Sequence, residues 1–370
     1  MDEKYLLLNG KKFYYDEIAA FSFRNSIPLD GYESKTLEFC RSWLSGVQEF
    51  PIQTSGSTGV PKTISLTRQQ MEASARRTIK LLNLQKGDCA LVCLNTEYIA
   101  GMMMLVRAFL ADLSIIIVDP VSNPLSLVNR EERIDFASFV PMQLQTILEE
   151  TPEALEQLNL MKGILVGGAP ISATLQREIQ RIKPAVCLTY GMTETASHIA
   201  VRRLNGAEAT DYYQVLDDIQ IGMDKRGCLT IRGDVTLNQL LSTNDIVELL
   251  TPTRFRWIGR ADNTINTGGV KVQIETVEVA VAAALAEAAL SPSFFVAAQP
   301  DELLGEKIVL IMEGDPLNEA QEIVFFNHLH TLLKKYEVPK EIIYSPSFSL
   351  TATGKVSRPL TMRKLGLYTD

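Results

Sequence analysis

The chain has 370 residues, of which 46% are hydrophobic and 22% are charged, and its formal net charge is −8. A chain of this length exceeds one compact core of ordinary size, so two domains are expected. The acidic balance, without a long run of Lys or Arg, argues against a general nucleic-acid binder. The five cysteines form no C-x-x-C pair, which favours reduced thiols in a cytoplasmic protein.

The N-terminal segment MDEKYLLLNG has acidic residues before a very short apolar run, which is unlike a signal peptide. The longest apolar stretch, residues 99–118, contains Arg107 and Asp112. This pattern predicts a buried helix followed by a strand rather than a membrane span. The sequence therefore predicts a protein without a membrane span, located in the cytoplasm.

After a strand-like segment at 63–67, the chain alternates between helical spacing and strand patterns from about residue 68 to 200. The expected strands are residues 63–67, 88–94, 114–118, 136–140, 162–168 and 185–190. The expected helices are residues 68–84, 99–112, 142–150 and 172–182. Repeated strand–helix–strand units predict a sheet with parallel strands flanked by helices.

Short strands dominate residues 201–258, which predicts a small β-rich subdomain. The sharpest boundary follows in GRADNTINTGG, and we place a hinge at Asp262. Beyond it we expect a helix at 279–290, strands at 293–299 and 307–312, another helix and a final irregular segment. The predicted fold is therefore α/β. A large N-terminal domain (1–261) has mixed and parallel sheets flanked by helices plus the β-rich subdomain, and a small mobile α+β domain (262–370) follows.

Residues 54–62, TSGSTGVPK, combine two glycines, four hydroxyl side chains and Lys62. Such a loop can wrap an anion, because backbone N–H groups and hydroxyls converge on phosphate oxygens. A flexible surface loop is the alternative, but the segment lies between the apolar FPIQ and the strand-like TISLT. A P-loop nucleotidase is excluded, because Pro61 stands where G-x-x-x-x-G-K-[ST] requires its second glycine.

Two further segments place glycines and polar groups after expected strands. LVGGAP (165–170) leads into a turn where open α/β sheets bind ligands, although a plain turn explains it equally well. TYGMTET (189–195) offers the Tyr190 ring, which can stack on adenine, and the Glu194 carboxylate. A carboxylate near phosphates requires a cation between them, so Glu194 indicates Mg²⁺. The alternative is a capping sequence, with a threonine starting the following helix.

Five motifs in order resemble those of the acyl-adenylate-forming enzymes, over residues 53 to about 360. The matching segments are 54–62 (T-S-G-[ST]-T-G-x-P-K), 190–194 (Y-G-x-T-E), 242–247 (a T-G-D segment), 259–278 (G-R-x-D-x-x-I-x-x-x-G-x-K-V-x-x-x-x-[VI]-E) and 351–358 (T-x-T-G-K-x-x-R). Asn244 replaces the glycine of T-G-D, and we expect the tolerance of asparagine for left-handed backbone angles to accommodate the change.

The resemblance implies that the chain binds ATP and Mg²⁺ and joins an acid to coenzyme A, its co-substrate. Lys355 would stabilise charge at the α-phosphate, Thr193 and Glu194 would act beside it, and Glu194 would hold the metal. Asp245 would hold both ribose hydroxyls. The implied ATP-binding residues are Thr54, Ser55, Gly56, Ser57, Thr58, Gly59, Lys62, Gly168, Ala169, Pro170, Tyr190, Gly191, Met192, Thr193, Asp245, Arg260 and Lys355.

The same resemblance implies a domain rotation between two half-reactions, with Asp262 as the hinge residue. After rotation the loop NTGGVK would line the CoA site through Gly268, Gly269 and Lys271. No cysteine nucleophile is required, because the adenylate is already activated.

The choice of acid rests on a narrower resemblance. Residues 94–112 are similar to the segment L-P-x-x-H-I-S-G-x-x-x-x-x-R of o-succinylbenzoate–CoA ligases of menaquinone biosynthesis, with Tyr98 in place of the histidine. Residues 138–148 resemble the S-x-V-P-T-Q-L-x-x-L-L segment of these enzymes. The resemblance implies an acyl pocket that includes Tyr98, Gly167 and Thr195, and it implies o-succinylbenzoate as the acid.

Other functions remain open at this stage. If o-succinylbenzoate is not its acid, the chain is expected to be another aryl- or fatty-acyl-CoA ligase. A separate alternative is an adenylation module that loads a carrier protein. A non-catalytic nucleotide-binding relic is disfavoured by the intact Lys355, Glu194 and Asp245. The segment before the phosphate loop is much shorter than is usual in the family, so a second copy of the chain, in a homodimer, is a candidate source of missing contacts.

Overall fold

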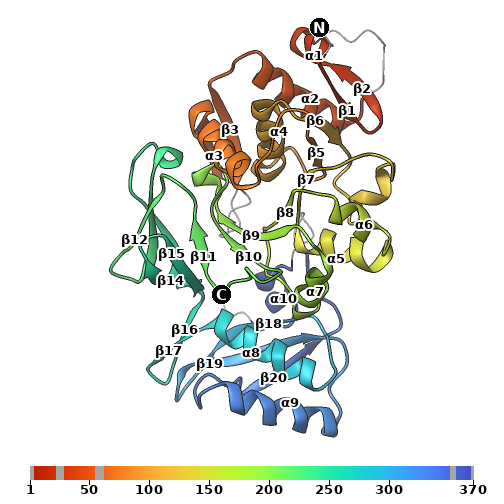
Figure 1. Ribbon diagram of the computed structural model, residues 1–370. Coiled ribbons are helices and arrows are strands. Elements are labelled where there is room, and N and C mark those ends of the chain that lie inside the picture. The colour runs from red at the N-terminus through yellow and green to blue at the C-terminus, as the bar shows by residue number, and fades with distance from the viewer. Residues whose placement is uncertain (1–3, 22–28, 55–61, 351–355, 368–370) are drawn as a thin grey trace. The chain divides into compact units, whose positions relative to one another are not determined.

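The computed structural model describes residues 4–21, 29–54, 62–350 and 356–367 (Figure 1). The chain forms two compact units. The first comprises Met1–Gly222, Thr230–Ser242 and Leu249–Arg256, and the second comprises Met223–Leu229, Thr243–Glu248 and Trp257–Asp370. The main part of the second unit thus begins shortly before Asp262, and the domain boundary placed there stays a prediction.

A parallel sheet forms the centre of the first unit, and most of its strands are those expected from the sequence. Its strand order is β1 (Tyr5–Leu8), β6 (Ser114–Ile117), β5 (Cys89–Val92), β7 (Phe136–Phe139), β8 (Gly163–Val166) and β9 (Ala185–Gly191). Each strand is parallel to its neighbours in this order. The carboxyl ends of the strands therefore meet at one edge of the sheet, where open α/β sheets bind their ligands.

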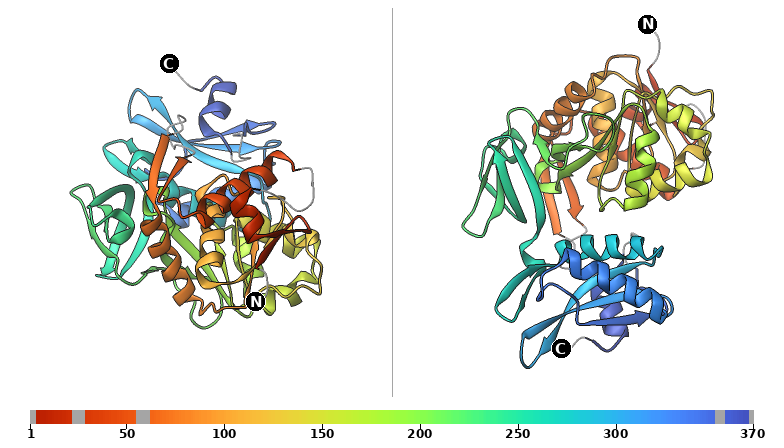
Figure 2. Two further views of the ribbon diagram at one scale, coloured as in Figure 1. Left: turned by 90° about the horizontal axis from the view of Figure 1, so that it is seen from above. Right: turned by 60° about the horizontal axis from the view of Figure 1, so that its bottom comes forward.

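Two groups of helices cover the two faces of this sheet (Figure 2). On one face, α2 (Gly31–Leu44), α3 (Arg68–Leu81) and α4 (Ile99–Ala111) share a core with strand residues such as Ala90 and Val92. On the other, α5 (Pro141–Glu150), α6 (Ala154–Asn159) and α7 (Ala173–Glu178) share a core with Leu91 and Cys93. The alternation follows from the two-residue period of a strand, and a sheet buried on both faces needs apolar residues on both.

Antiparallel strands extend the sheet at both edges. Beyond β9 lie β10 (His198–Arg203) and β11 (Tyr213–Val215), each antiparallel to its predecessor. The order then continues through β15 (Arg254–Arg260), β14 (Leu241–Thr251), β13 (Cys228–Arg232) and β12 (Gln220–Met223), which form the expected β-rich region. At the opposite edge β2 (Lys11–Tyr14) pairs with β1, and the short helix α1 (Tyr15–Ala20) follows it.

A separate hairpin holds the two ends of the predicted phosphate loop. β3 (Glu49–Thr54) and β4 (Lys62–Thr67) pair antiparallel, with Thr54 opposite Lys62. The strand expected at 63–67 is thereby confirmed. Helix α3 follows at once, because the Thr67 side chain accepts a hydrogen bond from the N–H of Gln70 and the Gln70 side chain accepts one from the N–H of Thr67.

The second unit has an α+β core of its own. β18 (Phe294–Asp301) and β19 (Gly305–Glu313) pair antiparallel, and β16 (Thr264–Thr267) pairs with both β17 (Val270–Gln273) and β19. Helices α8 (Ile274–Glu287) and α9 (Glu319–Leu332) share one apolar cluster with these strands. The prediction of an irregular final segment is wrong. β20 (Glu341–Ser345) pairs parallel with β19, and α10 (Arg358–Lys364) begins with a proline in its first turn.

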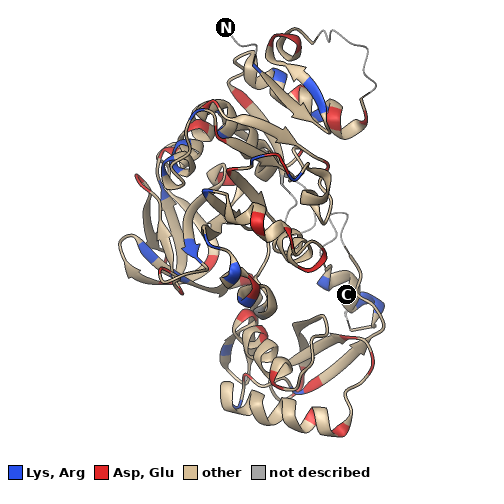
Figure 3. Ribbon diagram, turned by 45° about the vertical axis from the view of Figure 1, so that its right-hand side comes forward, with Lys and Arg blue, Asp and Glu red and all other residues tan. Residues whose placement is uncertain are grey.

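The long apolar stretch forms α4 and β6, as the sequence predicts. No helix in the described ranges is both long enough and apolar enough to cross a membrane. All five cysteines are buried and unpaired. Basic and acidic residues are distributed over both units (Figure 3).

The start of α4 requires a glycine. A Cβ added at Gly101 would lie 2.4 Å from the carbonyl oxygen of Asn95, whereas one added at Gly31 would meet nothing within 4 Å. We expect Gly101→Ala to lower the free energy of unfolding by about 1–3 kcal/mol, because the backbone of residues 94–95 must move. Gly31→Ala, at the first turn of α2, is the matched control and should change it by less than about 0.5 kcal/mol. Urea denaturation of both variants tests this, and equal midpoints would contradict the steric argument.

Candidate active site

A cavity of about 350 Å³ lies at the carboxyl edge of the parallel strands. It is bordered by the ends of β7, β8 and β9 and by the start of α4. The residues that line it are Leu94, Ile99, Ala100, Arg107, Ser138, Phe139, Val140, Leu165, Gly167, Gly168, Thr189, Gly191, Met192, Thr193, Ser197 and His198. Gly167 of the predicted acyl pocket and Gly168, Gly191, Met192 and Thr193 of the predicted nucleotide site therefore share one cavity.

Glycines let the strand ends approach one another at this cavity. A Cβ at Gly167 would lie 2.2 Å from the Thr189 hydroxyl oxygen, which itself donates to the Val166 carbonyl at 3.2 Å. A Cβ at Gly191 would lie 2.3 Å from the Ser197 carbonyl oxygen. Larger side chains at Gly167 or Gly191 would therefore displace the cavity wall. Ala169 and Pro170, also assigned to ATP, lie exposed in the turn after β8.

The segment after β9 forms a tight turn rather than the start of an α-helix. Residues Thr193–Thr195 make one 3₁₀ turn, and β10 begins three residues later. Thr195 is fully buried, and its hydroxyl accepts from the Met192 N–H at 3.1 Å and lies 2.7 Å from the Ser197 carbonyl. Thr195, which the sequence places in the acyl pocket, thus holds the turn that carries Thr193 and the half-buried Glu194. Ala196 closes the turn at φ +59°, a strained value for a residue with a side chain.

The Tyr190 ring, proposed to stack on adenine, belongs to an aromatic cluster. Its centroid lies 5.1 Å from that of Phe255 and 5.6 Å from that of Tyr213, and the latter two rings stack at 5.3 Å. Such contacts fix the plane of a ring. Tyr98, the predicted pocket residue of the acyl segment, precedes α4 and is 40% exposed, while Ile99 and Ala100 after it line the cavity.

Arg107 is a buried cation in the wall of the cavity. The residue is 2% exposed. Its guanidinium donates to Thr78 Oγ1 at 3.0 Å and to Ser197 Oγ at 2.7 Å, and Nη1 lies 3.8 Å from Met104 Sδ. These partners are neutral, and among the described residues no carboxylate pairs with Arg107. Burial lowers the pKa of Arg107 to about 9, so the side chain still carries its charge at pH 7.

His198 lies against the same guanidinium. It is 5% exposed, its Nε2 lies 3.2 Å from Thr78 Oγ1, and its Nδ1 lies 3.4 Å from Ser197 Oγ. Burial first, and the positive charge of Arg107 second, lower the pKa of His198 well below the usual 6.5. The imidazole is therefore neutral at pH 7.

The residues proposed for the ribose and the hinge lie together in the second unit. Arg260 donates from Nε and Nη2 to the two carboxylate oxygens of Asp262 at 2.9 and 2.8 Å, and its Nη1 lies 3.7 Å from Asp245 Oδ1. Trp257 Nε1 donates to Asp245 Oδ1 at 3.2 Å. The hydrogen bonds from Arg260 lower the pKa of Asp262 below its usual range. Arg260 and Asp262 thus form a bidentate ion pair in this arrangement.

Asn244 does not adopt the left-handed conformation that the sequence analysis used to explain it. It lies within strand β14, and it is absent from the described residues with positive φ. Its side-chain oxygen accepts from Arg226 Nη1 at 3.0 Å. An extended strand accepts asparagine without strain, so that explanation is wrong, and the replacement of glycine needs no special backbone angle here.

The turn proposed for CoA joins β16 to β17 in the second unit. Gly268 and Gly269 have φ values of +58° and +79°, which favour glycine, and Lys271 is exposed on β17. A Cβ at Gly268 would lie 3.0 Å from the Tyr336 ring. Ser55, Gly56, Ser57, Thr58, Gly59 and Lys355 lie outside the described residues, and of Thr54 and Lys62 only the backbone pairing is described.

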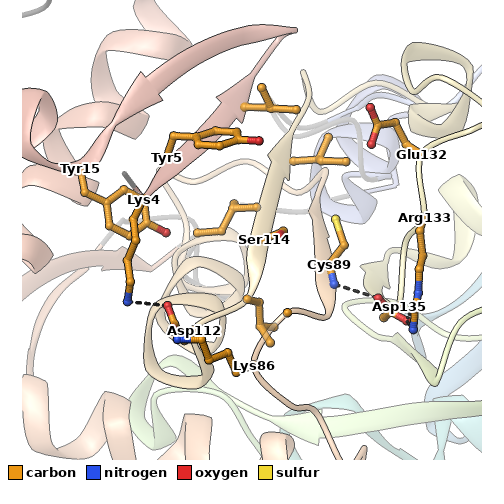
Figure 4. Close-up of a pocket in the computed structure, with 15 residues that line it drawn as sticks. Lys4, Tyr5, Tyr15, Lys86, Cys89, Asp112, Ser114, Glu132, Arg133 and Asp135 are labelled. Carbon is orange, nitrogen blue, oxygen red and sulfur yellow. Dashed lines mark hydrogen bonds and ion pairs between the residues drawn. The ribbon is translucent and has the colours of Figure 1, made fainter. Parts of the chain in front are cut away.

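A larger cavity, of about 690 Å³, lies elsewhere in the first unit (Figure 4). It borders Cys89 and Ser114, the first residues of β5 and β6, so it lies at the amino edge of the parallel strands. Its lysines pair with Asp112, at 2.6 Å for Lys4 and 2.8 Å for Lys86. Its arginine, Arg133, pairs with Asp135. These cations are already neutralised, and we place the active site at the smaller cavity.

Comparison with known proteins identifies the family. Residues 51–217 match the family model described as AMP-binding enzyme. The chain is 41% identical to an acyl-CoA synthetase (AMP-forming)/AMP-acid ligase II-like protein from Dyadobacter fermentans. The match to the crystal structure of that protein covers 92% of this chain and 96% of that one, with a TM-score of 0.61. The chain belongs to the AMP-binding enzymes of the acyl-adenylate-forming superfamily.

This AMP-binding enzyme is also similar to 2-succinylbenzoate–CoA ligases. It is 27% identical to that of Enterococcus faecalis, over 82% of this chain and 67% of the relative, and 28% identical to that of Staphylococcus aureus, over 82% and 65%. The chain thus spans about two thirds of the length of these curated relatives. The o-succinylbenzoate CoA synthetase of Bacillus subtilis, solved with its acyl-adenylate intermediate, has a TM-score of 0.70 at 21% identity, over 84% of this chain and 68% of that one, which shows a shared fold.

Sequence reasoning named neither Ser197 nor His198 of this AMP-binding enzyme as site residues. Their position directly after TYGMTETA, at the start of the next strand, was the only indication in the sequence that they could belong to the site. The sequence shows Arg107 only as a charged residue in the apolar stretch 99–118 and indicates no role for it in the site. The network that joins α3, α4 and β10 is formed by residues far apart in the sequence, so spacing alone does not predict it.

The neutral state of His198 has a consequence for stability. Because its pKa is lower in the folded than in the unfolded protein, the unfolded state binds more protons below pH 6.5 and stability falls there. His198→Asn removes this contribution. Relative to that variant, we expect the parent protein to lose up to about 1.4 kcal/mol of unfolding free energy per pH unit below pH 6.5, and nothing above about pH 7. Urea titrations of both proteins at several pH values measure the difference, and a difference independent of pH would show that His198 titrates normally.

Proposed function

We propose that this AMP-binding enzyme is an ATP-dependent acid–CoA ligase and that its acid is o-succinylbenzoate. In the first half-reaction a carboxylate oxygen of the acid attacks the α-phosphorus of ATP, giving the acyl-adenylate and pyrophosphate. In the second, the CoA thiol attacks the acyl carbon, giving the thioester and AMP. The similarity to 2-succinylbenzoate–CoA ligases supports this acid, and so does the chemistry of the cavity.

The buried charge of Arg107 is the observation that carries the choice of acid. An isolated buried cation is unfavourable unless an anion pairs with it. O-succinylbenzoate has two carboxylates, so one can react with ATP while the other pairs with the guanidinium. A monocarboxylic acid loses its only carboxylate to the α-phosphate and leaves Arg107 unpaired. The volume of about 350 Å³ lies within the range of small-molecule pockets.

The proposed nucleotide roles are those that the family motifs imply. We assign the adenine to Tyr190 and the turn Gly168–Pro170, and the phosphates to residues 54–62 and Thr193. Mg²⁺ is commonly held by one or two carboxylates plus substrate phosphates, and Glu194 next to Thr193 fits that pattern. When bound, the metal offsets phosphate charge. A related structure, from Bacillus subtilis, contains ATP and magnesium ion.

Roles in the second unit complete the proposal. We assign the ribose hydroxyls to Asp245 and the ribose or phosphate to Arg260. Lys355 is assigned to the developing charge at the α-phosphorus, because a fixed cation stabilises a transition state whose charge exceeds that of its ground state. Asp262 is the proposed hinge between residues 1–261 and 262–370, and Gly268, Gly269 and Lys271 are proposed to contact CoA. The homodimer and the cytoplasmic location stay predictions from the sequence.

The half-reactions can be separated by a change at Lys355. We expect Lys355→Ala to reduce pyrophosphate exchange by about a hundredfold or more, because one transition-state cation is lost. Thioester formation from supplied acyl-adenylate should persist at close to the parent rate. Lys364→Ala, a lysine of α10, is the control and should leave both rates unchanged. An equal loss of both half-reactions in Lys355→Ala would contradict the assignment.

The acid can be tested at Arg107. We expect the parent enzyme to exchange pyrophosphate with o-succinylbenzoate in preference to benzoate or a medium-chain fatty acid. Arg107→Gln should raise KM for o-succinylbenzoate by about tenfold or more, since hydrogen bonds between charged groups contribute about 1.5–3 kcal/mol. Its effect on benzoate should be less than about twofold. A preference of the parent for a monocarboxylic acid would replace the proposed substrate by another aryl or fatty acid, and activity with a carrier protein in place of CoA would replace the acceptor.

A further inference from the structure

Four polar side chains form a closed network behind the cavity wall. Arg107 of α4 donates to Thr78 of α3 and to Ser197, and His198 of β10 lies within hydrogen-bond range of both hydroxyls. Ser197 and His198 also line the cavity. Each hydroxyl has a single proton, so the network determines where those protons point.

Arg107 fixes the direction of two hydrogen bonds, and the distances around Thr78 favour a direction for the others. A guanidinium is a donor only, so Thr78 Oγ1 and Ser197 Oγ both accept from it. The Thr78 proton then has two acceptors within reach, His198 Nε2 at 3.2 Å and the Ser74 carbonyl at 3.5 Å. The shorter contact favours His198, which makes Nε2 an acceptor. Because the imidazole is neutral, its proton is then on Nδ1.

This tautomer determines what Ser197 presents to the cavity. The Nδ1–H faces Ser197 Oγ at 3.4 Å, so that oxygen accepts from both His198 and Arg107. With both lone pairs engaged, the Ser197 proton is directed away from the network. In the other tautomer Nδ1 would accept the Ser197 proton, and the cavity would face an oxygen lone pair, which repels a carboxylate.

We propose that His198 is a positioning residue for acid recognition, which acts through Ser197 so that the Ser197 hydroxyl and the Arg107 guanidinium donate together to the second carboxylate of the acid. The proposal rests on the proposed function for the identity of that acid. It assigns specificity to a pair of donors rather than to a charge alone. His198 sets the direction of the Ser197 hydroxyl and Ser197 contacts the acid.

The tautomer can be measured without any substrate. The chain has three histidines, so the ¹⁵N signals of His198 in histidine-labelled protein are assigned by comparison with His198→Asn. At pH 7 we expect Nδ1 to give the signal of a protonated ring nitrogen and Nε2 that of an unprotonated one. The reverse pattern, or a doubly protonated ring, would overturn the proposal even if o-succinylbenzoate proves to be the acid.

A double-mutant cycle tests whether His198 acts through Ser197. We expect His198→Leu and Ser197→Ala each to raise KM for o-succinylbenzoate by about five- to tenfold with kcat changed less than about twofold. The double variant should be no worse than either single one, because residues that act as one unit are not additive. Each single variant should keep kcat/KM for benzoate within about twofold of the parent value. Additive losses would mean that His198 contacts the acid directly, and equal losses on both acids would mean a merely structural role.

Two amide variants sharpen the result. The side-chain amide of His198→Asn can replace the Nδ1–H donor toward Ser197, whereas that of His198→Gln reaches the position of Nε2 toward Thr78. We expect His198→Asn to retain a KM within about threefold of the parent and His198→Gln to resemble His198→Leu. The opposite ranking would overturn the proposal. If the parent enzyme does not use o-succinylbenzoate, the proposed function fails, and the tautomer measurement still decides the orientation of Ser197.

Discussion

The central constraint in the first unit is the buried positive charge of Arg107, which lines the cavity at the carboxyl edge of the parallel strands. Burial lowers the pKa of Arg107 to about 9 without discharging it at pH 7, so the protein must hold the charge rather than neutralise it. Thr78 and Ser197 supply hydrogen bonds but no countercharge. Removing a cation from water is unfavourable by several kcal/mol, and two neutral hydrogen bonds offset only part of that. An anion that reaches Arg107 therefore stabilises the protein. The buried arginine, which lowers stability when it is unpaired, thereby favours ligands with a negative charge at this position.

The glycines around the cavity also help to position its polar groups, because they let backbone segments approach closely. At Gly167 and Gly191 the strand ends and the turn after β9 come so close that a Cβ would overlap oxygen atoms. This close approach brings the Ser197–His198 pair against α3 and α4. The strained backbone at Ala196 is held by the hydrogen bonds of the buried Thr195 hydroxyl. Fixed backbone and fixed donors together give a preorganised wall, in which little reorganisation is needed when an anion arrives.

The sequence predicted the parallel sheet, its covering helices and the strand after the phosphate loop, because strands such as β5 and helices such as α3 have strong local periodicity. It missed β20, whose five residues have no alternating pattern and pair with β19 only through the fold. The left-handed backbone angles expected at Asn244 were wrong, because this residue lies within strand β14. Gly167, Gly191 and Thr193 were predicted and line the cavity, whereas Ser197 and His198 were not, since a hydrogen-bond network between distant elements leaves no periodic trace. The loop 55–61 and Lys355 lie outside the described residues, and their roles stay predictions.

In the second unit, side chains proposed to bind the nucleotide interact with one another. Arg260 makes a bidentate pair with Asp262 while its third nitrogen lies 3.7 Å from Asp245, which also accepts from Trp257. These groups are partly exposed, so the pairs contribute little to stability and solvent can exchange with them at small cost. A ribose hydroxyl that donates to Asp245 Oδ1 would compete with Trp257 and Arg260 for that oxygen. A phosphate near Arg260 would likewise compete with Asp262. With the proposed roles, nucleotide binding would exchange the partners of Asp245 and Arg260 and would release Asp262, the proposed hinge residue, from its pair with Arg260.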